Sequence, residues 1–209
     1  RMSRGLGDVY KRQVLNWYKN PLNRDYSKTL ELEVAGVPHV FAWGGLHGAI
    51  PKYHGEGWFV NVDVASYYPS LMLVYKWLSR NVHDPSKYAE IYHTRLKLKA
   101  EKNPMQQPYK IVLNSTYGAM KDKHNAMYDP RQANNVCVGG QLLLLDLIER
   151  LEDHCEIIQS NTDGILVKLR RYEDFEMLDD LCWEWEQRTG MRLEFDEFQK
   201  VYQLSLIHI

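Results

Sequence analysis

The sequence is poor in cysteine, with three in 209 residues, and these lie far apart at Cys137, Cys155 and Cys182. An odd number of widely spaced cysteines argues against a disulfide framework and against a zinc site, so we expect reduced thiols in a cytosolic protein. The patterns H-E-x-x-H, C-x-x-C and G-x-x-x-x-G-K-[ST] are also missing, so none of these short motifs carries a function here.

Long apolar segments are absent as well. No run of about 18 apolar residues occurs, so we expect no membrane-spanning helix and no membrane partner. The first residues are basic but are not followed by the apolar segment of a secretory signal. With 44% hydrophobic and 25% charged residues, the composition is that of an ordinary globular protein.

The net charge is only −1, but the charged residues are unevenly distributed along the chain. Eight Lys and Arg stand against three Asp and Glu between Lys87 and Lys123, whereas fifteen acidic residues stand against six basic ones between Glu149 and Phe198. A basic block can meet phosphates and an acidic block can carry metal ligands. Charge alone fits solvated helix faces equally well.

The two ends differ from the interior. Residues 1–13 (RMSRGLGDVYKRQ) and 204–209 (LSLIHI) show no continuity with their neighbours. We expect a non-native or disordered leader and a non-native tail, translated from linker or sequencing-adaptor sequence, and we leave both out of the functional argument.

The interior predicts an α+β fold, in which helices cover a sheet. Trp58–Val64 is short and rich in β-forming residues, which indicates a buried strand, and a hairpin is expected over Glu156–Leu169 around an Asp-Gly turn. Asp84-Pro85 and Asp129-Pro130 have the pattern of helix N-caps. The expected helices are Pro69–Trp77, Pro85–Lys102, Gln106–Ala119, Pro130–Asp153 and Tyr172–Gly190, with a last strand at Arg192–Gln203.

A first candidate motif is Asp63–Ser70 (DVASYYPS), in which a carboxylate ends the buried strand and a helix begins a few residues later. This arrangement places Asp63 at the edge of a sheet, where a metal ion and a triphosphate can lie against helix-terminal N–H groups. A turn or cap role would explain an isolated aspartate in the same position.

A second motif is Lys110–Gly118 (KIVLNSTYG). On a helix Lys110, Asn114 and Tyr117 share one face, which offers a cation, an amide and an aromatic ring to phosphate, sugar and base. A similar basic stripe, made of Arg95, Lys99 and Lys102, lies on the preceding helix. Two such stripes would form a triphosphate clamp, although an exposed amphipathic helix also explains each of them.

The third motif is Ser160–Gly164 (SNTDG), between two apolar runs. Asp-Gly is a common hairpin turn, so a structural role explains it in isolation. Together with the first motif it predicts a metal site, because carboxylates on neighbouring strands can hold two Mg²⁺ ions about 4 Å apart.

These three motifs resemble, in order and spacing, those of family B DNA polymerases. DVASYYPS resembles motif A (D-x-x-S-L-Y-P-S), KIVLNSTYG agrees with every specified position of motif B (K-x-x-x-N-S-x-Y-G), and SNTDG resembles the D-T-D hairpin of motif C. The resemblance covers about residues 14–203. Phe41–Ile50 (FAWGGLHGAI) is similar, more weakly, to the Gly-Gly segment that joins exonuclease and polymerase domains in phage members.

The resemblance implies a bacteriophage-type DNA-directed DNA polymerase in the cytoplasm of an infected bacterial host. It implies an antiparallel palm sheet with helices on one face and a two-helix fingers insertion. The expected parts are a pre-palm linker at 14–57, palm at 58–83 and 120–203, and fingers at 84–119. The exonuclease carboxylates and the thumb of the full-length family are missing. Partners would be primer-template DNA and dNTPs.

The resemblance also implies roles for single residues. Asp63 and Asp163 would ligate two Mg²⁺ ions, with the Val64 carbonyl as a further ligand. Asn161 departs from the family, which has an aspartate there, so one negative charge is missing. Tyr68 would lie under the sugar and exclude a 2′-hydroxyl group. The other expected dNTP contacts are Ser66 and Tyr67 through their backbone, Lys110, Asn114, Tyr117 and Gly118, and a fingers cation, which is Arg95 or Lys99, with Lys97 also open.

Two other readings stay open at this point. The chain would be a DNA-binding polymerase remnant if Asn161 or truncation has removed activity. It would otherwise be another two-metal nucleotidyltransferase, such as an RNA-copying enzyme. A bulky ring at Tyr68 argues against RNA synthesis, since it would clash with a 2′-hydroxyl group.

Overall fold

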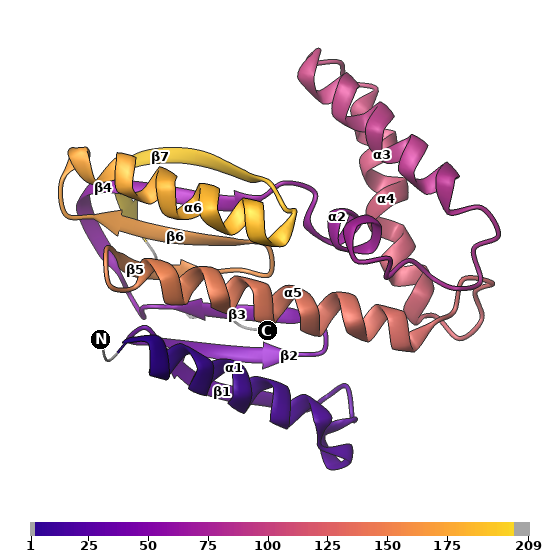
Figure 1. Cartoon of the computed structure of the whole chain (residues 1–209), viewed down its shortest axis with the longest axis horizontal. Coiled ribbons are helices and arrows are strands. Elements are labelled where there is room, and N and C mark those ends of the chain that lie inside the picture. Colours follow the sequence, from indigo (N-terminus) through magenta and orange to yellow (C-terminus); the bar gives the residue numbers. More distant parts are fainter. Residues whose placement is uncertain (1–2, 203–209) are drawn as a thin grey trace. The chain divides into compact units, whose positions relative to one another are not determined.

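The computed structural model describes residues 3–202, and the side chains from residue 10 onward (Figure 1). The chain forms two compact units. The sheet unit contains residues up to 65 and from 138, and the helical unit contains residues 66–137. Each unit is described by itself below.

The sheet unit holds seven strands: β1 (Thr29–Val34), β2 (Val37–Ala42), β3 (Gly45–Ala49), β4 (His54–Val64), β5 (Glu156–Ser160), β6 (Gly164–Leu169) and β7 (Leu193–Tyr202). They form one sheet in the order β1-β2-β3-β5-β6-β4-β7, and every neighbouring pair is antiparallel. The predicted α+β class is confirmed. Strand β4 lies between β6 and β7, far from its neighbours in the sequence, which brings the first and third motifs together.

Helices cover one face of this sheet. They are α1 (Ser3–Lys19), the second half of α5 (Pro130–Leu151) and α6 (Phe175–Thr189), which all lie on the same side in Figure 1. Successive strand residues point to opposite faces, and in β4 Val60, Val62 and Val64 are buried whereas Asn61 and Asp63 are partly exposed. The valines therefore belong to the core under the helices, and Asp63 lies on the face that these helices leave uncovered.

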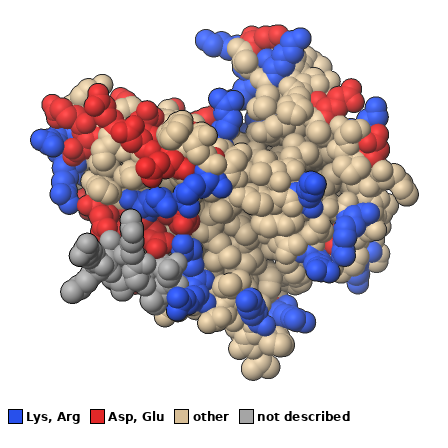
Figure 2. Space-filling model, in the orientation of Figure 1, with Lys and Arg blue, Asp and Glu red and all other residues tan. Residues whose placement is uncertain are grey.

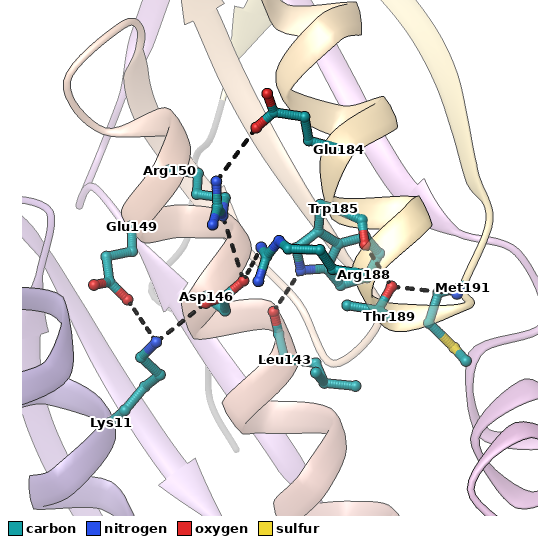
Figure 3. Close-up of polar contacts among 10 residues, drawn as sticks. All are labelled: Lys11, Leu143, Asp146, Glu149, Arg150, Glu184, Trp185, Arg188, Thr189 and Met191. Carbon is teal, nitrogen blue, oxygen red and sulfur yellow. Dashed lines mark hydrogen bonds and ion pairs between the residues drawn. The ribbon is translucent and has the colours of Figure 1, made fainter. Parts of the chain in front are cut away.

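Helices α5 and α6 are joined by polar contacts around one fully buried ring (Figure 3). The indole nitrogen of Trp185 donates to the Leu143 carbonyl at 3.1 Å, and Arg188 forms an ion pair with Asp146 at 2.5 Å. The ion pair is partly exposed to solvent and contributes little, about 0–1 kcal/mol. Burial of Trp185 therefore makes the larger contribution to this contact.

The helical unit contains α2 (Tyr67–Val74), α3 (Pro85–Ala100), α4 (Gln106–Lys121) and the first half of α5. Helices α3 and α4 pack against each other as a hairpin. The predicted N-cap at Asp84 is confirmed, because its carboxylate accepts the Ser86 N–H at 3.0 Å. Helix α2 begins two residues before the predicted start at Pro69, so this proline lies in the first turn, where its missing N–H costs no hydrogen bond.

The segment 14–57, which we expected to be a linker, contributes β1, β2 and β3 to the same sheet. In β3 the glycines obscure the pattern of a strand, whereas Thr29–Val34 (TLELEV) alternates polar and apolar residues and was overlooked. Helix α1 starts at Ser3 and crosses residue 13 without a break, so the expectation of a disordered leader is wrong from Ser3 onward. The non-native origin of residues 1–13 stays a prediction, and residues 204–209 lie outside the described part.

Acidic side chains on the face seen in Figure 2 gather over α6. Exposed acidic residues of this helix include Glu176, Asp179, Asp180 and Glu184. They lie on the helix-covered side, so this part of the acidic block is a solvated helix face, and only the members of the block near β4 concern the candidate site. Among residues 3–202 no helix is long and apolar enough to cross a membrane.

Candidate active site

The first and third motifs meet on two paired strands. Asp63 is paired with Gly164 in the β4–β6 ladder, and the Val64 N–H donates to the Asp163 carbonyl at 2.7 Å. The Asn161 N–H donates to the Gly164 carbonyl at 2.8 Å and closes the turn between β5 and β6. The predicted hairpin is confirmed. Asp63 lies near the end of β4, whereas Asp163 lies in the turn directly before β6 and not on a strand.

Glycine is required at position 164 because of Asp63. A Cβ atom at this residue would overlap the Asp63 Oδ1 atom, and it would lie 3.1 Å from the Val62 carbonyl oxygen. Gly164 therefore makes room for the Asp63 carboxylate beside the hairpin. The Asp163-Gly164 dipeptide therefore forms part of the hairpin turn and also leaves room for the Asp63 carboxylate.

The electrostatics of the site are those of crowded carboxylates. Partial burial, then the charge of Asp163, and then that of Asp196 raise the pKa of Asp63 from 3.8 to about 6. A hydrogen bond from the Asn61 amide, at 2.6 Å, lowers the same pKa and does not offset the rise. Ionised Asp63 thus lacks a nearby cation among the described residues and is suited to bind one.

The ligands available here are hard oxygen atoms, which fit Mg²⁺. The described residues contain no group of three or more His, Cys, Asp or Glu side chains arranged for a metal ion. Mg²⁺ is commonly held by one or two carboxylates together with water and substrate phosphates, so two carboxylates suffice. Asp63, Asp163 and the Val64 carbonyl would hold the metal ions. Their role as ligands stays a prediction.

Asn161 is exposed at the start of the turn, and its side-chain oxygen accepts a hydrogen bond from the Gln159 amide at 3.3 Å. The Asn161 side chain is thus hydrogen-bonded to a residue of the same hairpin. A pocket of about 320 Å³ lies next to it on the uncovered sheet face, and it is lined by Asn61, Asn161, Leu166, Phe198 and Lys200, among others. The sequence analysis missed Phe198 and Lys200, since β7 carries no motif that we recognised.

The helical unit contains a buried cation, Arg95 of α3, which is 7% exposed. Its Nη1 atom donates to the Ser66 hydroxyl, and its Nε atom is buried without a hydrogen-bond partner. No described carboxylate forms an ion pair with it. Lys97 and Lys99 are exposed on the same helix. Of the three cations left open by the sequence, Arg95 is the one whose burial calls for an anion.

Ser66 is held in an uncommon conformation, with a φ of +48° in the left-handed region. Such backbone costs about 1–3 kcal/mol and persists only where the surroundings enforce it. A second serine of the same motif, Ser70, lies 3.1 Å from the Tyr92 hydroxyl of α3. The sequence analysis did not single out Tyr92, although its spacing from Arg95, three residues, places both on one helix face.

The second motif lies on α4 with the expected division of faces. Lys110 and Asn114 are exposed, whereas Leu113, Thr116 and Met120 are buried against the rest of the helical unit. The shared face of Lys110, Asn114 and Tyr117 therefore does not pack into an apolar core. A Cβ atom at Gly118 would meet no atom within 4 Å, so the space over this residue is open.

The two adjacent tyrosines of the first motif have different surroundings. Tyr67 is 4% exposed and belongs to the core. Tyr68 is partly exposed, and its ring meets that of Tyr117 edge-on with centroids 4.7 Å apart. Burial raises the pKa of Tyr68 well above 10. Within the helical unit, the first and second motifs are therefore in direct contact through these rings.

Comparison with known proteins gives one distant match. A stretch of 97 residues, or 45% of this chain, is 29% identical to DNA polymerase II of Escherichia coli (strain K12). The chain is distantly related to a DNA polymerase. The matched stretch spans 12% of the length of that polymerase, and no family model matches the chain.

The raised pKa of Asp63 predicts that its ionised form destabilises the metal-free protein. The carboxyl group contributes stability that is complete below pH 3.8 and lost as the pH rises through about 6. We expect Asp63→Asn to increase the free energy of unfolding at pH 8 by about 1 kcal/mol, a value discounted for solvent screening. Urea unfolding in EDTA at pH 8 and pH 5 measures this.

The increase in the free energy of unfolding caused by Asp63→Asn should be smaller at pH 5 than at pH 8. The matched control is Asp180→Asn, which removes an exposed carboxylate of α6 and should change the free energy of unfolding by less than about 0.5 kcal/mol. A clear loss of stability in Asp63→Asn at pH 8 would contradict the prediction.

Proposed function

We propose that this chain carries the catalytic core of a template-directed DNA polymerase. The single observation that carries the proposal is the pair Asp63 and Asp163: the pairing of β4 with β6 sets Asp63 beside the turn that carries Asp163, and no cation of the described residues contributes to the pKa shift of Asp63. The distant similarity to a DNA polymerase supports the same class of function.

The proposed reaction is attack of a primer 3′-hydroxyl group on the α-phosphate of a dNTP. Two bound Mg²⁺ ions would activate the hydroxyl group and stabilise the leaving pyrophosphate. Asp63 and Asp163 would hold these ions, because the pairing of β4 with β6 sets Asp63 beside the turn that carries Asp163. Asn61 donates to Asp63 and orients its carboxylate.

The helical unit supplies the groups for the nucleotide. Arg95 is a buried cation that forms no ion pair with any carboxylate of residues 10–202, and a triphosphate would provide a negative charge. Backbone N–H groups of Ser66 and Tyr67, at the start of α2, would contact phosphate oxygens, since a helix N-terminus favours anions. Lys110 adds a cation on α4, and the open space over Gly118 leaves room for a flat base.

The primer would approach Asp63 along the uncovered face of the sheet. The pocket beside Asn161 is lined by Lys200 and by Asn61, whose amide donates to Asp63. Lys200 pairs there with Glu56 at 2.8 Å, an exposed ion pair that a backbone phosphate can displace at small cost.

Primer extension by a protein containing residues 1–209, with helix α1 intact, tests the function. We expect Mg²⁺-dependent incorporation of dNTPs directed by the template, and a loss of about 10³-fold or more in Asp63→Asn and Asp163→Asn. Asp180→Asn is the control and should retain activity. DNA binding without incorporation would favour the inactive remnant, and preferential use of NTPs would favour an RNA-copying enzyme.

Arg95→Met separates a binding role from a structural one. We expect the KM for dNTP to rise about 10- to 100-fold, since a charge-assisted contact to phosphate is lost. The melting temperature should stay unchanged or rise, because the substitution removes a buried charge that has no ion-pair partner.

Lys97→Met is the matched comparison on the same helix, and it should change the KM by less than about threefold, as is usual for an exposed charge. A lower melting temperature with an unchanged KM in Arg95→Met would show that Arg95 is structural.

Tyr68→Ala tests the sugar gate. The Tyr68 ring is held against Tyr117 and precedes Pro69, which restricts its backbone, so it has little freedom to move aside for a 2′-hydroxyl group. We expect dNTP-over-NTP selectivity to fall about 10²- to 10³-fold while dNTP use is largely kept. Tyr67→Phe is the control, since that ring is buried. Unchanged selectivity in Tyr68→Ala would rule out this gate.

A further inference from the structure

A buried hydrogen bond in the sheet unit joins strand β2 to the hairpin that carries Asp163. His39 of β2 is 1% exposed, and its Nε2 atom lies 2.9 Å from the hydroxyl oxygen of Ser160, which is also 1% exposed. Ser160 is the last residue of β5 and directly precedes the turn that ends in Asp163. None of the roles given above involves His39.

The imidazole ring crosses a whole strand to reach Ser160. His39 is paired with Gly48 between β2 and β3, and Gly48 is paired with Ser160 between β3 and β5. A Cβ atom at Gly48 would overlap the ring. Glycine on the middle strand therefore makes the contact between the outer two strands possible.

The hydrogen bonds fix the tautomer of the ring. Its Nδ1 atom lies 2.8 Å from the Val37 carbonyl oxygen, which can only accept, so Nδ1 carries the proton. Nε2 is then the acceptor and receives the Ser160 hydroxyl proton. Burial lowers the pKa of His39, which keeps the ring neutral. The Ser160 hydroxyl group is thereby held in one direction.

Strand β3 also touches the turn itself. Gly45 has a φ of +151°, and a Cβ atom there would overlap the side chain of Thr162. The hairpin is thus held at its base by the contact between His39 and Ser160, and at its tip by the contact between Gly45 and Thr162. Both contacts depend on a glycine of β3.

We propose that His39 is a positioning residue for Asp163, acting through Ser160 to hold the hairpin where the Asp163 carboxylate stays beside Asp63. The inference rests on the proposed function, because a shared metal site needs ligands held within about 0.5 Å. His39 itself touches neither the carboxylates nor a substrate. If the contact between His39 and Ser160 were purely structural, its loss would lower stability without changing metal affinity. Metal affinity therefore distinguishes the two roles.

Mn²⁺ binding, followed by electron paramagnetic resonance, reports on the site without any need for activity. We expect the dissociation constant for Mn²⁺ to rise about tenfold in His39→Ala and in Ser160→Ala. The double variant should be no worse than either single one, since both remove the same contact. His39→Gln should restore affinity to within about threefold, because its side-chain carbonyl can accept the Ser160 hydroxyl proton.

Trp185→Phe is the matched control, since it removes a buried hydrogen bond to Leu143 without touching the hairpin. It should lower the melting temperature and leave Mn²⁺ affinity within about twofold of the wild type. If His39→Ala does not fold, Ser160→Ala decides, because it removes only a hydroxyl group.

Equal Mn²⁺ affinities in the wild type, His39→Ala and Ser160→Ala would overturn the positioning role and leave the metal site intact. A wild-type protein that binds no Mn²⁺ would instead reject the metal site, and the proposed function with it.

Discussion

The antiparallel pairing of β4 with β6 is the constraint on which the candidate site depends. These strands are separated by about half the chain, yet their register sets Asp63 opposite Gly164 and next to Asp163. A shift of one residue would turn Asp63 to the helix-covered face and expose the valines of β4, so burial of the core enforces the register. The hydrophobic core under α5 and α6 thus determines where the charges lie.

Each unit contains charged side chains in surroundings that destabilise them. The sheet unit holds Asp63 beside other carboxylates, and the helical unit buries Arg95 against a serine instead of an acid. Both arrangements cost stability relative to neutral residues of similar size. Their opposite signs fit opposite ligands, namely cations at the carboxylates and a phosphate anion at Arg95.

The sequence predicted most of the helices, the hairpin and the two carboxylates, because caps, Asp-Gly turns and strand ends are local signals. It failed for β3, since Gly45 and Gly48 are present for their neighbours in space and not for strand propensity, and the alternation of Thr29–Val34 in β1 was overlooked. It also left the choice between Arg95 and Lys99 open. Both fit the same stripe, and only tertiary packing buries one of them. Contacts between distant strands, such as that of His39 with Ser160, leave no pattern along the chain.

The amide at position 161 stands where the family pattern has a carboxylate, and the surroundings of Asp63 explain how the site tolerates it. Asp196 and Glu194 of β7 already raise the pKa of Asp63, so negative charge reaches the site from the other side of β4. A further carboxylate on the hairpin would add to this repulsion. Asn161 instead accepts a hydrogen bond from Gln159. The negative charge around Asp63 is therefore shared between the hairpin and β7, and it does not depend on a carboxylate at residue 161.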